Sequence, residues 1–423
     1  MAKTLLHNAR QILTCAAQKA KRGAYLRDIG LLLNSSLLVE DGKIVDIGPA
    51  SNIKAKYSKE VEDGNCSFLD MSGKVLLPGF VDSHTHALFV GTREDEFEMR
   101  IEGKTYVDIL LGGGGILNTV NKIRKADEEE LIEESIPRLQ RMLRHGTTTV
   151  EIKSGYGLDI ESEIKMLRAI EGLKGKQELD VVPTFMGAHA IPPEYNNDLD
   201  GFTKHIIDEM LPKVANECSA KFCDIFTEKK VFPYAQSDRI LAAARDLGFK
   251  VKIHADEIET IGGVDLAIKH DAVSAEHLLK TSEEGIEKLA KSNVIACLLP
   301  GTAYSLMHKH YARAREMIDK GVAVALATDC NPGSCYTENL QLIISMACTQ
   351  MGMLASEAIN ACTYNAACSL GISDRVGSLE KDKQADIIAM DIPDYKYIPY
   401  HFGVNHVSFV MKKGEVVVGS NAS

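Results

Sequence analysis

The sequence predicts an α/β protein: a (β/α)8 barrel with a small β-sandwich domain built from both chain ends. Three observations support this fold class. The middle of the chain alternates strand-like apolar runs with amphipathic helical stretches, the order that gives right-handed β-α units and a parallel sheet. The two ends share a different style of short strands and turns. Eight strand-like runs, the number in a closed barrel, end near His86, Tyr156, His189, Glu228, Glu257, His277, Gly301 and Asp329.

The first part of the chain, to about Lys74, reads as alternating strands and turns. The pair Asp41-Gly42 lies between two apolar runs and is a strong hairpin signal. The same pattern returns in residues 385–390 and 407–418. We therefore expect a β-sandwich domain formed by residues 1–75 and 371–423, with the barrel in residues 76–370.

Helical periodicity is clearest in three stretches of the middle region, residues 128–145, 161–173 and 313–320. A doubly wound open sheet is the competing architecture, but it needs a glycine fingerprint directly after its first strand. The run Gly112 to Gly115 lacks the Lys and Ser/Thr of a phosphate-binding loop and follows no clear strand. We interpret it as a loop.

Composition limits the function classes. At 423 residues the chain suits a large barrel with an accessory domain. A net charge of -11 and an isoelectric point near 5.7 argue against nucleic-acid binding, which needs clustered Lys and Arg. No segment reaches the ~18 apolar residues of a membrane span, and no secretory leader is visible. The ten cysteines form no Cys-x-x-Cys pair. These features favour a cytoplasmic enzyme acting on a small molecule.

The most informative segment is residues 78–86, where an apolar run ends in His84 and His86. Residues i and i+2 of a strand point to the same side, so the two imidazoles share one face. Two surface histidines that fall together by chance would look the same. However, His254 and Asp329 also end strand-like runs, and barrels place their active sites at the carboxyl ends of their strands.

The set His84, His86, His254 and Asp329 offers three nitrogens and one carboxylate oxygen, which suits one Zn2+ or Fe ion per chain. Asp329 also precedes a turn-like segment, so a structural aspartate is the alternative. Glu257, three residues after His254, can move a proton between a metal-bound water and a leaving group. Its alternative role is a helix N-terminal acid.

Several further motifs resemble those of the amidohydrolase superfamily of metal-dependent hydrolases, over nearly the full chain. They include residues 78–86, 93–100, 153–158, 187–189, 254–257, 276–278 and 328–334. The resemblance is to the branch that opens the ring of 4-imidazolone-5-propanoate, giving N-formimidoyl-L-glutamate in histidine degradation. It implies one metal ion on the four residues above, catalytic roles for Glu257, His277 and His189, and a homodimer. The implied substrate contacts are Arg93, Tyr106, Tyr156, His189, Glu257, Asn331, Gly333 and Ser334.

The implied substrate is an anion, and Arg93 offers a planar fork that binds carboxylates bidentately. Without the resemblance, Arg93 reads as a surface residue within the acidic run 94–98. A purine or pyrimidine deaminase is the alternative activity, but its uncharged substrate would not need Arg93. A binuclear hydrolase would require a modified lysine, and Lys153 is assigned no ligand role. A non-catalytic barrel would be expected to have lost a ligand or the acid/base.

Overall fold

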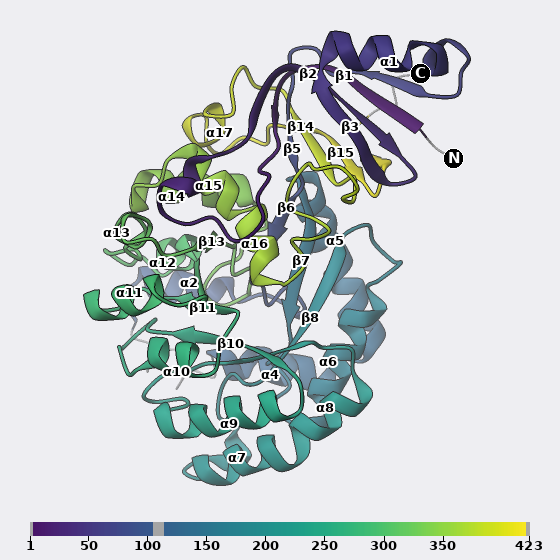
Figure 1. The fold of residues 1–423 in the computed structure, drawn as a ribbon. Coiled ribbons are helices and arrows are strands. Elements are labelled where there is room, and N and C mark those ends of the chain that lie inside the picture. The colour runs from purple at the N-terminus through teal and green to yellow at the C-terminus, as the bar shows by residue number, and fades with distance from the viewer. Residues whose placement is uncertain (1–2, 105–113, 420–423) are drawn as a thin grey trace.

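The barrel lies at the centre of the chain in the computed structural model, which describes residues 3–104 and 114–419. Eight parallel strands form one sheet in the order β13-β12-β11-β10-β9-β8-β7-β6. Figure 1 shows helices packed around this sheet, which confirms the predicted barrel. The strands are β6 (Phe80–Asp82), β7 (Thr147–Lys153), β8 (Asp180–Ala188), β9 (Phe222–Ile225), β10 (Lys250–Ala255), β11 (Ser274–His277), β12 (Ile295–Leu298) and β13 (Val324–Leu326).

The two outer strands of this sheet, β6 and β13, are joined just beyond their carboxyl ends. The Asp329 N–H donates to the carbonyl of His84 at 3.0 Å, and the His86 N–H donates to that of Cys330 at 2.9 Å. Thr85 and Cys330 form a parallel bridge. These bonds close the barrel at the end where the predicted metal ligands lie.

Helices predicted at residues 128–145, 161–173 and 313–320 are confirmed as α5, α6 and α13. Asp127 caps α5 by accepting from the Glu130 N–H, and Asp159 caps α6 by accepting from the Ser162 N–H. The helices around the barrel are α2 (Glu94–Ile101), α4 (Ile116–Lys125), α5 (Glu128–Arg144), α6 (Ile160–Gly172), α7 (Leu199–His205), α8 (Leu211–Glu217), α9 (Tyr234–Asp246), α10 (Gly263–Lys269), α11 (Glu283–Ala290), α12 (Pro300–Ser305), α13 (Ala314–Asp319), α14 (Leu340–Met351), α15 (Ala355–Ala361) and α16 (Tyr364–Ser369). Shorter helical segments are η1 (Gly23–Arg27), η2 (Pro193–Tyr195), η3 (Ile206–Met210) and α17 (Tyr397–Tyr400).

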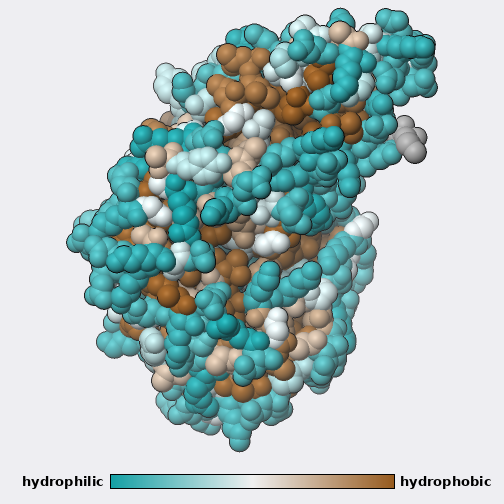
Figure 2. All heavy atoms as spheres, viewed as in Figure 1, coloured by the Kyte–Doolittle hydropathy of each residue, from teal (hydrophilic) through white to brown (hydrophobic). Residues whose placement is uncertain are grey.

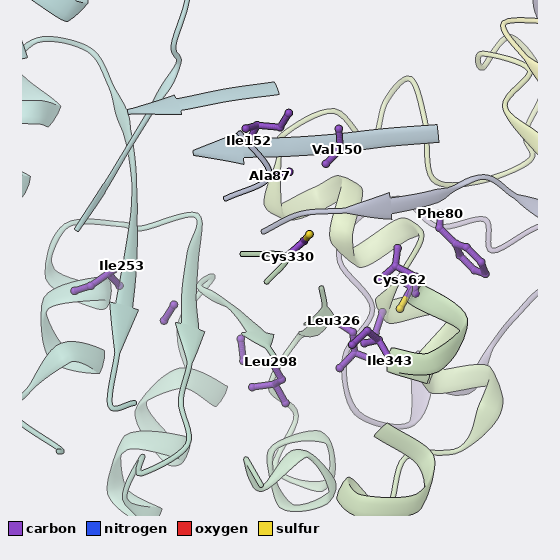
Figure 3. Close-up of a cluster of buried hydrophobic side chains, with 14 of the residues drawn as sticks. Phe80, Ala87, Val150, Ile152, Ile253, Leu298, Leu326, Cys330, Ile343 and Cys362 are labelled. Atoms are coloured by element: carbon purple, nitrogen blue, oxygen red, sulfur yellow. The ribbon is translucent and has the colours of Figure 1, made fainter. Parts of the chain in front are cut away.

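Successive side chains of the barrel strands alternate between the helix-facing side and the barrel interior. Val150 and Ile152 of β7 belong to the large hydrophobic core, and Figure 3 shows them with Ile253 of β10 among the core side chains. The residues between them, such as Glu151, point the other way, because successive side chains of a strand face opposite sides. The helices therefore pack on apolar residues, while the barrel interior receives polar ones.

Strands from both chain ends form a separate sheet, the end sheet, in the order β16-β15-β14-β5-β1-β2-β3, with β4 also paired to β1. Figure 1 shows the purple N-terminal strands beside the yellow C-terminal ones, as predicted. The predicted boundaries at residues 75 and 370 stay predictions. The strands are β1 (Lys3–Leu13), β2 (Leu31–Glu40), β3 (Lys43–Pro49), β4 (Ser67–Asp70), β5 (Val75–Pro78), β14 (Ile387–Met390), β15 (Val407–Lys412) and β16 (Glu415–Val418).

The predicted hairpin is confirmed between β2 and β3, where Glu40 pairs with Lys43. Asp41 and Gly42 have φ values of 49° and 77°, as a two-residue type I′ turn requires. Helix α1 (Ala50–Glu62) was not predicted, since only strands and turns were expected in this region. It forms because Ile53 and Tyr57, four residues apart, pack together against the end sheet.

Ion pairs join the end sheet to the barrel, and of their lysines Lys412 is buried whereas Lys413 is exposed. Asp180, at the start of β8, lies 3.1 Å from Nζ of Lys412 and 2.7 Å from Nζ of Lys413. Figure 2 shows apolar side chains on the surface over the end sheet, within a largely hydrophilic exterior. No helix in the described part of the chain is long and apolar enough to cross a membrane.

Candidate metal centre and active site

Three of the four predicted metal ligands meet at the carboxyl end of the barrel. Oδ1 of Asp329 lies 3.4 Å from Nε2 of His84 and 3.8 Å from Nε2 of His86. Two ligand atoms that are each about 2.1 Å from a tetrahedral ion stand about 3.4 Å apart. All three residues are buried, and Nε2 of His84 has no hydrogen-bond partner. The spacing and the unpartnered nitrogen fit a metal ion.

His254, the fourth predicted ligand, lies beside His84, with ring centroids 4.6 Å apart. Its Nδ1 is 3.1 Å from Oδ1 of Asp224, which leaves Nε2 for an ion. His84, His254 and His277 form a second group of closely spaced potential ligand atoms. The structure thus gathers all four predicted ligands and brings His277 to the same place.

Two of these residues have unusual backbone geometry. Asp329 has φ 55° and His277 has φ 69°, in the left-handed region that residues other than glycine seldom adopt. Such conformations cost about 1–3 kcal/mol, and active sites are one place where they cluster. Oδ2 of Asp329 also accepts a hydrogen bond from Thr302 Oγ1 at 2.5 Å, which fixes the carboxylate against the histidines.

The electrostatics keep Asp329 ionised. Burial would raise its pKa, but the contacts with His84 outweigh burial and the pKa falls to about 2. Burial would lower the pKa of His84, but the neighbouring Glu276 carboxylate and Asp329 raise it to about 9. The carboxylates around His84 therefore favour positive charge at this ring, which a proton or a metal ion would provide.

Glu257 lies next to this group. Its Oε2 is 3.6 Å from Nε2 of His277. Burial, with a smaller contribution from Asp329, raises the pKa of Glu257 to about 8, and burial lowers the pKa of His277 to about 3. Both residues line a small pocket that is partly open to solvent. A carboxyl group with a pKa near neutrality suits proton transfer.

His189 and Tyr156 form another wall. The His189 ring stacks on His86 with centroids 4.8 Å apart, and Tyr156 lies 5.3 Å from His189. Nδ1 of His189 is 2.9 Å from the Gly155 carbonyl, which can only accept. Burial lowers the pKa of His189 to about 3, so the ring is neutral. With its proton on Nδ1, His189 presents Nε2 as an acceptor.

The loop that carries Gly155 and Tyr156 is held by Glu163. This buried carboxylate accepts hydrogen bonds from the backbone N–H groups of Gly155, Gly157 and Leu158. Gly155 has φ 102°, and a Cβ there would lie 2.9 Å from Nδ1 of His189. Only glycine can therefore bring the chain this close to His189.

Arg93 lies between α2 and the loop after β13. Its Nε and Nη2 donate to the two oxygens of Glu96 at 2.9 and 2.6 Å. A Cβ at Gly333 would be 2.3 Å from Nη1 of Arg93, so the guanidinium faces that loop. Asn331 shapes the loop, since its Oδ1 accepts from the N–H groups of Gly333 and Ser334 at 2.8 and 2.7 Å.

One predicted contact, Tyr106, lies outside the described residues. Conversely, sequence reasoning assigned no role to a group of buried charges beneath the histidines: Glu151, Asp224, Lys252 and Glu276. Glu151, Asp224 and Lys252 each lie between two apolar residues of their strand, as in the segment Lys250–Ala255, and Glu276 follows Ala275. A charged residue alternating with apolar ones in a barrel strand was the signal available in the sequence.

A barrel with clustered histidines and a carboxylate at its carboxyl end is the architecture of a metal-dependent hydrolase. The model of the amidohydrolase family matches residues 75–417. Imidazolonepropionase from Alkaliphilus oremlandii is 48% identical over 98% of this chain and 97% of its own. Imidazolonepropionase from Bacillus velezensis is 48% identical with the same coverage. The chain therefore belongs to the amidohydrolase family and, within it, to the group of the imidazolonepropionases.

Solved structures agree on the fold. Guanine deaminase from E. coli superimposes with a TM-score of 0.73 at 15% identity, covering 99% of both chains. Triazine hydrolase from Arthobacter aurescens gives a TM-score of 0.72 at 17% identity, covering 99% of this chain and 95% of its own. At such identities the likeness concerns the barrel and the end sheet alone.

Proposed function

We propose that this protein hydrolyses the ring amide of 4-imidazolone-5-propanoate to give N-formimidoyl-L-glutamate, a step of histidine degradation. The observation that carries the proposal is the buried group His84, His86 and Asp329 in a chain 48% identical to an imidazolonepropionase over 98% of its length. The reaction breaks the C–N bond of a cyclic amide and adds water across it.

We propose one Zn2+ or Fe ion per chain, held by His84, His86, His254 and Asp329. Three imidazoles and one carboxylate serve either metal. When bound, such an ion lowers the pKa of a coordinated water and polarises a carbonyl group. The nearly complete burial of the four side chains supports the assignment, since water is largely excluded from competing for them.

Glu257 is proposed as the proton-transfer group. It lies beside His277 in the space next to the metal centre, and its raised pKa allows it to take a proton from water and release it to the departing ring nitrogen. His277 and His189 are both neutral at pH 7. Nε2 of His189 can accept from an N–H of the imidazolone ring, which would orient the ring in the site.

The propanoate group is proposed to bind near Arg93. Two nitrogens of this guanidinium are held by Glu96, and the third faces the loop at Gly333. Tyr156 lies close enough to Arg93 for the guanidinium charge to act on the Tyr156 hydroxyl. This hydroxyl can donate a hydrogen bond to the propanoate carboxylate. Asn331, Gly333 and Ser334 form the loop on the other side of Arg93. The contacts expected from Gly333 and Ser334 stay predictions.

The experiment is a direct assay of turnover. Purified protein is incubated with 4-imidazolone-5-propanoate, and loss of the ultraviolet absorbance of the ring is followed, with guanine and dihydrouracil as controls. Turnover of the imidazolone alone supports the proposal. Turnover of guanine would support the deaminase alternative instead. Turnover of dihydrouracil would support a binuclear cyclic-amide hydrolase. The homodimer and the cytoplasmic location stay predictions, and light scattering in solution tests the first.

A further inference from the structure

A layer of charge lies inside the barrel beneath the histidines. It consists of five side chains without exposed surface, here called the charged layer: Glu151, Lys153, Asp224, Lys252 and Glu276. Three carboxylates and two ammonium groups leave an excess of one negative charge. Burying a charge costs free energy unless the charge is paired. Packing alone therefore does not explain the charged layer.

Two carboxylates of the charged layer contact both the histidines and Lys153. Oδ1 of Asp224 is 3.1 Å from Nδ1 of His254, and its Oδ2 is 2.7 Å from Nζ of Lys153. Oε2 of Glu276 contacts Nδ1 of His84 and lies 3.2 Å from the same Nζ. The ammonium of Lys153 therefore lies between the two carboxylates that orient two of the proposed metal ligands.

The two carboxylates and the two histidines that they contact could hold a metal ion themselves. One atom each of His84, Asp224, His254 and Glu276 lie within 4.8 Å of one another, and two carboxylates with two imidazoles suit a divalent ion. In this chain the positive charge beside them comes from Lys153.

We propose that Lys153 is a positioning residue that fills a second cation position. By pairing with Asp224 and Glu276, its ammonium keeps both carboxylates directed at Nδ1 of His254 and His84, and it limits the centre to one metal ion. This inference rests on the ligand set proposed above. Groups that contact the far nitrogen of a metal-binding imidazole fix its tautomer and orientation.

Lys252 provides a matched control within the charged layer. Its Nζ contacts Glu151 at 2.8 Å and Glu276 at 3.1 Å, and it donates to the Ser83 carbonyl at 3.0 Å. Asp224 is not among its contacts in the described residues. Replacing Lys252 removes the same charge from the same layer, but it does not open the space between Asp224 and Glu276.

The test compares Lys153→Gln and Lys252→Gln with the unaltered protein. Each is stripped of metal, titrated with Zn2+ or Co2+, and assayed by elemental analysis and by the visible spectrum of bound Co2+. We expect about one ion for the unaltered protein and for Lys252→Gln. For Lys153→Gln we expect about two ions and an altered cobalt spectrum, since the histidines lose their fixed orientation.

A Lys153→Gln protein that binds one ion with unchanged affinity and an unchanged cobalt spectrum overturns the inference. If the unaltered protein binds no ion, the proposed ligand set fails instead, so the two failures can be told apart. Should Lys153→Gln not fold without metal, thermal unfolding is recorded against Zn2+ concentration. The inference expects Zn2+ to restore a cooperative transition by replacing the missing ammonium, and a protein that Zn2+ does not restore contradicts it.

Discussion

Oδ1 of Asp224 lies 3.1 Å from Nδ1 of His254, and neither side chain has appreciable exposed surface. This contact sets the proton of His254 on Nδ1 and turns Nε2 toward the proposed ion. The two residues come from neighbouring strands, β9 and β10, so the sheet itself fixes the pair.

Removing the Asp224 carboxylate should weaken metal binding, although Asp224 is not one of the proposed metal ligands. For Asp224→Ala we expect the affinity for Zn2+ to fall about 10- to 100-fold, measured by competition with a chelating dye. Asp224→Asn should lose less, because its amide oxygen can still accept from Nδ1. If Asp224→Ala binds Zn2+ as tightly as the unaltered protein, the contact does not orient His254.

Substitution of Glu257 should separate catalysis from metal binding. For Glu257→Gln we expect metal to be retained and turnover to fall about 100-fold or more, because the proton-transfer group is lost. The fall of kcat/KM toward acid pH, where Glu257 is protonated, should disappear with it. Near-normal turnover would mean that His277 or solvent moves the proton.

The same substitution should stabilise the metal-free protein. The pKa of Glu257 is raised to about 8 in the fold, against about 4.3 in an unfolded chain. Between these values the folded state holds more protons, so stability falls as pH rises. Glu257→Gln removes this cost, and we expect a gain of about 1–3 kcal/mol at pH 8, measured by urea unfolding. Equal stability at pH 8 would contradict the raised pKa.

Some parts of the fold and of the candidate site could be predicted from the sequence, and others could not. Strand-end residues such as His84 and Asp329 could be predicted, because the carboxyl ends of barrel strands converge whatever the details of packing. The pairing of Lys153 with Asp224 and Glu276 could not be predicted, because these two residues come from other strands and the contacts depend on barrel register. Helix α1 was missed because its two anchoring residues, Ile53 and Tyr57, are a weak signal within a polar stretch.

The surroundings of Arg93 could be predicted from the sequence only in part. Its acidic neighbours favoured a surface residue, whereas the structure shows its side chain largely buried, with a bidentate pair to Glu96 and a face on the Gly333 loop. Sequence spacing could give the i,i+3 pair. It could not give the approach to a loop more than 200 residues away, which depends on barrel closure.

Loss of Arg93 should act on substrate binding. For Arg93→Ala we expect a KM about 10- to 150-fold higher, the value of a partly desolvated Arg–carboxylate contact, with a smaller effect on kcat. Arg93→Lys should recover only part of this, since a single ammonium cannot keep the bidentate pair with Glu96 and also present a donor at the position of Nη1. An imidazolone with a neutral side chain should be a poor substrate that is indifferent to Arg93→Ala. Equal handling of both compounds by the unaltered protein would remove Arg93 from the site.

Asp180 should stabilise the junction of barrel and end sheet. Burial would raise its pKa, but Lys412 and Lys413 hold it well below its ordinary value. A depressed pKa means that the stabilisation is complete above about pH 4 and is lost as pH falls through the folded value. We expect Asp180→Asn to lower the free energy of unfolding by about 1–3 kcal/mol at pH 7, with a smaller difference near pH 3.

The control for Asp180 is an exposed ion pair. Lys229 and Glu259 lie 3.3 Å apart with side chains 64% and 47% exposed, so Glu259→Gln should change stability by less than about 0.5 kcal/mol. Urea unfolding between pH 7 and pH 3 measures both variants. A pH-independent loss in Asp180→Asn would indicate a packing effect rather than a charge effect.

The central claim is that one metal ion in this barrel supports hydrolysis of 4-imidazolone-5-propanoate. The direct measurement adds Zn2+ or Fe2+ stepwise to metal-free protein while the loss of imidazolone absorbance is followed. We predict that activity is absent without metal, rises linearly and reaches its plateau at about one ion per chain. Full activity in the stripped protein, or a plateau at two ions per chain, would contradict the claim.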